Sequence, residues 1–166
     1  MESPSYQRNS SGQKEGALRE DWGQSPNVQV FYGRQAELAT LERWIVSDHC
    51  QMVVVFGIGG IGKTTLAAKL AEQIKGEFGS VFWRSLQHAP TLKTLLSECI
   101  QFLSDEKKID LPENVEDQIA QLIGYFRRHR CLVVLDNVES ILQKGQMAGQ
   151  YREGYEGYGV LFPPFR

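Results

Sequence analysis

Apolar residues along this chain occur in two patterns, short unbroken runs and stripes that repeat every three to four positions. The runs lie at 52–56, 80–86 and 131–135, and their Val, Phe and Leu content predicts buried strands. The stripes predict helices at 35–46, ahead of Gly76, at 91–103 and at 112–130. The resulting order of strand, helix, strand, helix, helix, strand is typical of an α/β domain with helices on both faces of a parallel sheet.

The two ends of the chain lack this periodicity. Residues 1–24 are rich in Ser, Gly, Gln and charged residues, which predicts a disordered tail or linker. Residues 146–166 are rich in Gly and Tyr without a regular period, which predicts an irregular tail. We therefore expect one folded domain over residues 25–145.

The strongest motif follows the first apolar run. Residues 57–64 read Gly-Ile-Gly-Gly-Ile-Gly-Lys-Thr and match the G-x-x-x-x-G-K-[ST] pattern of a Walker A phosphate loop. Its glycines let the backbone turn N–H groups toward phosphate oxygens, and the next helix adds the positive end of its dipole. Lys63 can reach the β- and γ-phosphates, and the Thr64 hydroxyl can coordinate Mg²⁺. The expected contacts are Gly57, Gly59, Gly60, Ile61, Gly62, Lys63, Thr64 and Thr65.

A second apolar run ends in a carboxylate. Residues 131–136 read Cys-Leu-Val-Val-Leu-Asp, the Walker B pattern, which places Asp136 at the carboxyl end of a buried strand. There Asp136 would hold the water shell of Mg²⁺ opposite Thr64. The alternative is a core strand followed by an Asp-Asn turn. A phosphate loop upstream favours the Walker B interpretation.

Composition and charge limit the expected partners and the expected cellular location of the protein. The net charge of −2 gives no general case for binding nucleic acid or a membrane. No apolar run approaches the roughly 20 residues of a transmembrane helix, and the N-terminus lacks the apolar core of a secretory signal. The cysteines Cys50, Cys99 and Cys131 are odd in number and widely spaced, which indicates reduced thiols and not a set of disulfides. We therefore expect a cytoplasmic protein whose partner is a nucleotide.

Four segments resemble one family of ATPases. They are Phe-Tyr-Gly-Arg-Gln-Ala-Glu-Leu at 31–38, Gly-Ile-Gly-Gly-Ile-Gly-Lys-Thr-Thr-Leu at 57–66, Phe-Trp-Arg-Ser-Leu at 82–86 and Leu-Val-Val-Leu-Asp-Asn-Val-Glu at 132–139. Over residues 21–158 the chain is similar to NB-ARC domains of the signal-transduction (STAND) class, above all bacterial ones joined to C-terminal β-propeller repeats. The resemblance implies a three-layer P-loop NTPase fold with a parallel sheet, and ADP or ATP with Mg²⁺ as cofactors.

The resemblance also implies residues at the adenine. Phe31 and Tyr32 would pack against the base and bind it through backbone hydrogen bonds, and Arg34 would make a polar contact beside it. Taken without the resemblance, these residues indicate a hydrophobic staple ahead of a helix and a solvated arginine. Both interpretations stay open at this point.

Two features depart from the family pattern. The acid that often follows the Walker B Asp is replaced by Asn137, whose amide can orient water but cannot accept a proton, and Glu139 is the nearest carboxylate. We therefore expect slow or no hydrolysis and assign no catalytic residue. The family also continues with a sensor strand between the Walker A and Walker B strands and with further helical domains. Because the chain ends at Arg166, we expect a domain truncated after the Walker B strand.

The expected function is nucleotide binding by part of a signalling switch, with self-association only in full-length relatives. One alternative is a stand-alone ATPase or small-molecule kinase, which would need an acid near Asn137 and an acceptor pocket. The other is a remnant that binds no nucleotide and acts as an interaction fragment.

Overall fold

The structure is a computed structural model that describes residues 17–104, 109–143 and 150–162. Its strands are β1 (Arg19–Asp21), β2 (Ser80–Ser85) and β3 (Cys131–Asp136). Its α-helices are α1 (Gln35–Glu42), α2 (Lys63–Ile74), α3 (Leu92–Leu103) and α4 (Val115–Arg128). A short π-helix, Arg43–Ser47, extends α1, and 3-10 helices lie at Lys75–Glu77, Val138–Ile141 and Glu156–Val160.

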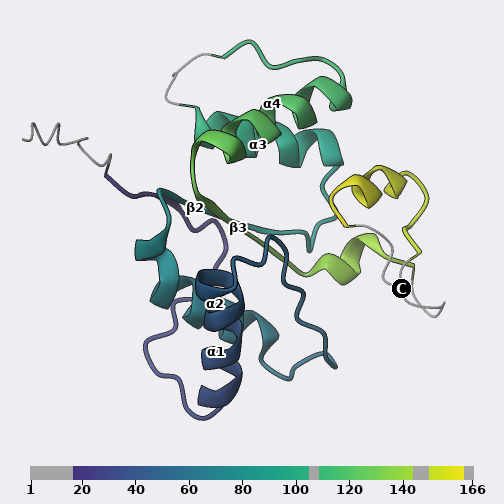
Figure 1. The fold of residues 1–166 in the computed structure, drawn as a ribbon. Helices are drawn as coiled ribbons and strands as arrows, with labels where there is room; N and C mark the ends of the chain where they lie inside the picture. Colours follow the sequence, from purple (N-terminus) through teal and green to yellow (C-terminus); the bar gives the residue numbers. More distant parts are fainter. Residues whose placement is uncertain (1–16, 105–108, 144–149, 163–166) are drawn as a thin grey trace, which may run out of the picture.

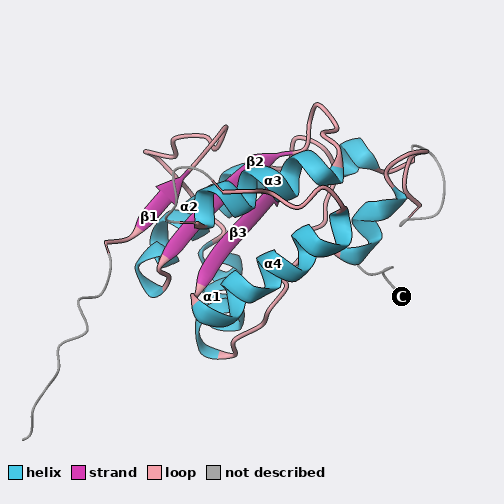
Figure 2. Ribbon diagram, turned by 90° about the horizontal axis from the view of Figure 1, so that it is seen from above, coloured by secondary structure: helices cyan, strands magenta, loops and turns pink. Residues whose placement is uncertain are grey.

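The strands form one parallel sheet in the order β1-β2-β3 (Figure 2). Ser80 is paired with Arg19 on one side and with Cys131 on the other, and the register of β2 and β3 runs on to Ser85 opposite Asp136. Parallel pairing brings the carboxyl ends of all three strands to the same edge. Asp136 therefore stands at the sheet edge where α/β proteins bind their ligands.

Helices cover both faces of the sheet, as predicted. Figure 1 shows α3 and α4 on one side of the strands and α1 and α2 on the other. Alternate residues of β3 divide accordingly: Val133 and Leu135 pack against the cluster built by α3 and α4, whereas Leu132 packs against α1 and α2. Trp83, fully buried, packs against Ala68 and Ala71 of α2. The α/β, three-layer expectation is confirmed.

Local signals place the starts of two helices. The Thr91 side chain accepts a hydrogen bond from the backbone N–H of Thr94 at 3.2 Å, and the Asn114 side chain accepts one from Asp117 at 2.7 Å. Each side chain thereby satisfies a backbone donor that the first turn leaves unpaired.

Within the described ranges, none of the helices has the length and apolarity to cross a membrane.

The predicted strand at 52–56 is wrong. The segment is not assigned to a strand, and the third strand of the sheet is β1 instead. The apolar pattern of residues 52–56 nevertheless has a structural role, because Val53 and Val55 pack against the cluster between α1 and α2. Met52 and Val54, on the alternate positions, are 44% and 41% exposed. An apolar run makes a strand only where a neighbour pairs with its backbone, and β3, at the end of the strand order, is paired with β2 alone.

The predicted tail at 1–24 is also wrong in its last part. β1 lies inside it, and Arg19 donates to the backbone oxygens of Phe102, Leu103 and Ser104. Asp21 binds Arg84 of β2 with an N···O distance of 2.7 Å. Charged contacts hold this strand, so a search for apolar periodicity does not find it. Residues 1–16 lie outside the described part of the chain.

The predicted tail at 146–166 is irregular, but in its described part it is not a tail. Residues 150–162 pack against the α3–α4 side of the sheet, and the side chain of Tyr158 is 0% exposed. The hydroxyls of Tyr155 and Tyr158 donate to the carbonyls of Ala89 and Pro90 at 2.7 and 2.8 Å. Aromatic rings and hydroxyls thus dock a segment that has no helical or strand period. Residues 144–149 and 163–166 lie outside the described part.

Candidate nucleotide-binding site

The phosphate loop connects the extended segment 52–56 to α2 and has the backbone shape that its glycines predict. Gly60 and Gly62 have φ angles of 82° and 86°, a left-handed region in which side chains other than glycine are strained. Gly62 directly precedes α2, which begins at Lys63. The first N–H groups of α2, and the positive end of its dipole, therefore stand at the loop.

Two cationic side chains contact backbone carbonyls of the loop. The Lys63 ammonium donates to the carbonyls of Gly57 and Ile58 at 2.8 and 3.2 Å, so this side chain arches back over the loop. The Arg34 guanidinium donates to the carbonyl of Ile61 at 3.1 Å and pairs with Glu37. Positive charge thus gathers where the phosphates of a nucleotide are expected.

The two Walker motifs meet in one hydrogen bond. The Thr64 hydroxyl donates to Oδ1 of Asp136 at 2.8 Å. A hydroxyl has one proton and two lone pairs, so this bond leaves the lone pairs of Thr64 for a cation. Mg²⁺ prefers hard oxygen ligands and keeps several waters beside one or two protein groups and substrate phosphates. The Thr64 and Asp136 oxygens fit that requirement, and the described residues include no larger cluster of His, Cys, Asp and Glu suited to a metal.

Asn137 lies next to Asp136 in the left-handed backbone region, with φ of 56°. Its side-chain amide donates to Oγ of Ser85 at 2.8 Å and to Oδ2 of Asp136 at 3.4 Å. Glu139, the next carboxylate along the chain after Asp136, is exposed on the 3-10 helix Val138–Ile141. Ser85 was not predicted as part of this site. Its position at the end of β2, in register with Asp136, could have been found only from the strand pairing.

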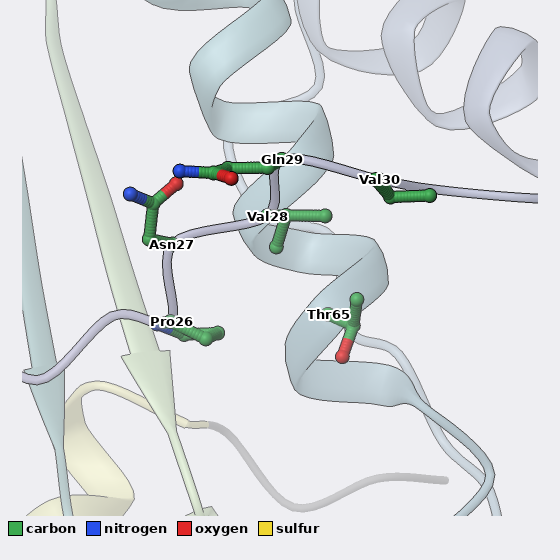
Figure 3. A pocket seen from close by; sticks show the side chains of 6 residues that line it. All are labelled: Pro26, Asn27, Val28, Gln29, Val30 and Thr65. Carbon is green, nitrogen blue, oxygen red and sulfur yellow. The ribbon is translucent and has the colours of Figure 1, made fainter.

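A cavity of about 370 Å³ lies beside the phosphate-loop helix (Figure 3). It is lined by Thr65 of α2 and by the preceding segment Pro26, Asn27, Val28, Gln29 and Val30. Of the residues predicted at the adenine, Phe31 packs against the cluster between α1 and α2, and Tyr32 is 89% exposed. Neither lines this cavity, so their contacts with a base stay predictions.

Arg84 of β2 forms two ion pairs. Its guanidinium binds Asp21 and Glu98, each with an N···O distance of 2.7 Å, and stacks over the ring of Phe82. The hydrogen bond to Arg84 lowers the pKa of Asp21, against the opposing effect of burial, and the same bond raises the pKa of Arg84. These contacts tie β1, β2 and α3 together, which is a structural role.

The sequence of this chain is similar to those of known proteins. The family model of the NB-ARC domain matches residues 34–155. An uncharacterised WD repeat-containing protein of Nostoc sp. is 44% identical over 149 residues, which are 84% of this chain. The probable disease resistance proteins RF45 and RDL5 of Arabidopsis thaliana are each 26% identical over 92% of the chain. No solved structure matches significantly.

The chain spans only 12% of the length of the Nostoc relative and 14% of RF45. The matched residues 34–155 nevertheless contain the phosphate loop, the Walker B strand and both ligands proposed for Mg²⁺. NB-ARC domains are nucleotide-binding domains of the P-loop class. From the match and the geometry together, the chain belongs to the NB-ARC domain family.

Proposed function

We propose that this NB-ARC domain binds ADP or ATP together with Mg²⁺ and serves as a signalling switch that hydrolyses ATP slowly or not at all. The hydrogen bond between Thr64 and Asp136 carries the proposal, because it joins the two nucleotide motifs at 2.8 Å. Those residues are 72 positions apart in the sequence. A glycine-rich turn that matched the motif by accident would have no reason to meet a Walker B carboxylate.

The geometry supports one placement of the nucleotide. The phosphates would lie on residues 57–64, contacting the loop N–H groups and Lys63, and Thr64 would face Mg²⁺. The base would enter the cavity beside residues 26–30, because Thr65 belongs both to the phosphate-loop helix and to the wall of that cavity. Arg34, bound to the carbonyl of Ile61, would stand nearer the phosphates than the base.

Slow hydrolysis follows from Asn137. Both hydrogens of its amide are directed at acceptors, Ser85 Oγ and Asp136 Oδ2, and an amide cannot take a proton from water at neutral pH. A bound Mg²⁺ would neutralise phosphate charge, but Asn137 supplies no base that could take a proton from the attacking water. ADP and ATP would therefore act as long-lived ligands. We expect a cytoplasmic setting, and in a full-length relative the exchange of ADP for ATP would shift the population of two conformations.

The test is calorimetric titration of the whole chain with ADP and Mg²⁺, compared with Lys63→Ala. Lys63 supplies charge-assisted hydrogen bonds worth about 1.5–3 kcal/mol, so we expect affinity to fall roughly 10- to 100-fold. Lys69→Ala is the matched control, because it removes the same charge from the same helix, α2, further from the loop. Equal ADP affinity in Lys63→Ala and wild type would show that residues 57–64 are not the phosphate site.

A further inference from the structure

A row of hydrogen bonds runs along the carboxyl edge of the sheet, from α2 to the end of β2. Thr64 donates to Oδ1 of Asp136, the Asn137 amide donates to Oδ2 of the same carboxylate, and that amide also donates to Oγ of Ser85. Both oxygens of Asp136 are therefore held, one from α2 and the other through a side chain anchored on β2.

The direction of the Asn137 amide is set by its neighbours. A carboxylate only accepts hydrogen bonds, so the amide must turn its NH₂ group toward Asp136. The shorter bond, at 2.8 Å, is the one to Ser85, which makes Ser85 the stronger anchor of the two. Ser85 is itself fixed, because its Oγ also accepts from the backbone N–H of Gln87 at 3.2 Å and its backbone is paired with Asp136.

We propose that Ser85 is a positioning residue for Mg²⁺: through Asn137, it holds the Asp136 carboxylate in the orientation in which that carboxylate receives the water shell of the ion. The inference rests on the proposed function. Within the described residues, the hydrogen bonds of the Ser85 side chain join it to Gln87 and Asn137, not to Thr64 or the loop glycines. Its effect on the metal therefore passes through the side chains of Asn137 and Asp136.

Removing the Ser85 hydroxyl leaves the Asn137 amide with only its long bond to Asp136. The amide can then rotate, and Oδ2 of Asp136 loses its fixed donor. Groups that orient metal ligands typically contribute 10- to 100-fold to metal affinity. Because Asp136 already keeps its bond to Thr64, we expect the lower end of that range, roughly 10-fold. ADP binding without Mg²⁺ should not change, since the phosphate loop and the cavity beside residues 26–30 are untouched.

The experiment measures ADP affinity by calorimetry at a series of Mg²⁺ concentrations, with EDTA as the metal-free point. In Ser85→Ala, we expect a roughly 10-fold rise in the Mg²⁺ concentration that produces half of the maximal change in ADP affinity. Ser80→Ala is the matched control, because it removes a hydroxyl from the opposite end of the same strand. Ser85→Thr should keep the wild-type value, since it retains Oγ and since Ser85 lines a second cavity, of about 290 Å³, that offers space for the extra methyl group.

A double-mutant cycle shows whether Ser85 acts through Asn137. Asn137→Gly removes the amide and suits the backbone φ of 56°, so the fold is retained. We expect Asn137→Gly to shift the Mg²⁺ dependence by a similar amount and Ser85→Ala to add nothing to it. Additive shifts, or a Ser85→Ala curve equal to wild type, would overturn the inference.

Failure of the inference is distinguishable from failure of the proposed function. Wild-type protein whose ADP affinity depends on Mg²⁺, with the same dependence in Ser85→Ala, overturns the inference alone. ADP binding without any Mg²⁺ dependence overturns the inference and the Mg²⁺ part of the proposed function. Wild-type protein that binds no ADP overturns both. If a thermal melt shows that Ser85→Ala does not fold, the Mg²⁺ titration of Asn137→Gly tests the proposal instead. An unchanged Mg²⁺ dependence in that variant also overturns the proposal.

Discussion

Replacing Tyr158 by Phe tests whether residues 150–162 are part of the folded core. The side chain is fully buried, its ring stacks with those of Tyr155 and Phe162, and its hydroxyl donates to the Pro90 carbonyl at 2.8 Å. The change keeps the ring and leaves the half-buried Pro90 carbonyl without this donor, which costs about 1–3 kcal/mol of unfolding free energy. Tyr158→Ala, which removes the ring as well, should cost about 3–5 kcal/mol.

Urea unfolding followed by tryptophan fluorescence measures both losses, because Trp83 is fully buried in the native state. Val160→Ala is the matched control: it lies two positions away in the same 3-10 helix, its side chain is 62% exposed, and it should change stability by less than about 0.5 kcal/mol. Losses in Tyr158→Phe and Tyr158→Ala no larger than in Val160→Ala would refute the docking of this segment.

Three further outcomes are expected. The wild-type chain with Mg²⁺-ATP should release no phosphate above background. Asn137→Asp, which supplies a carboxylate beside Asp136, should raise the rate of phosphate release. Brisk wild-type turnover that is lost in Lys63→Ala would indicate an ordinary ATPase. The exposed apolar side chains of residues 52–56 should make the isolated chain self-associate, as measured by sedimentation velocity. Val54→Lys should reduce this self-association. A wild-type chain that is monomeric at all concentrations would contradict the prediction. Burial raises the pKa of Cys99 from 9.0 to about 12, so the unfolded thiol loses its proton first and unfolding free energy should fall as the pH rises from about 9 to 12. This fall should be smaller in Cys99→Ala, and an unchanged slope would count against the burial of that thiol.

The sequence by itself determined the features that depend on local chemistry. The glycines and Lys63 of the phosphate loop specify its backbone and the helix that follows, because left-handed φ angles and a helix start are properties of neighbouring residues. The helical stripe at 92–103 predicted α3 with its buried face, and the Walker B run predicted β3 with Asp136 at its end. The apolar run 80–86 predicted a buried strand, and its Trp83 is fully buried.

The tertiary structure alone decided what depends on partners distant in the chain. The apolar run 52–56 is a better strand by composition than Arg19–Asp21, yet only the latter pairs with β2. A strand requires a neighbour's backbone, and the side chains of β1 add distant contacts: Asp21 binds Arg84 of β2, and Arg19 donates to the carbonyl of Leu103 at the end of α3. Tyr158 is buried by contacts with residues near position 90, which no local period reveals. Ser85 lies beside the proposed Mg²⁺ ligand Asp136 for the same reason: the register of β2 and β3 sets the two residues opposite each other. Register is a property of the sheet, since pairing free energy comes from both strands at once.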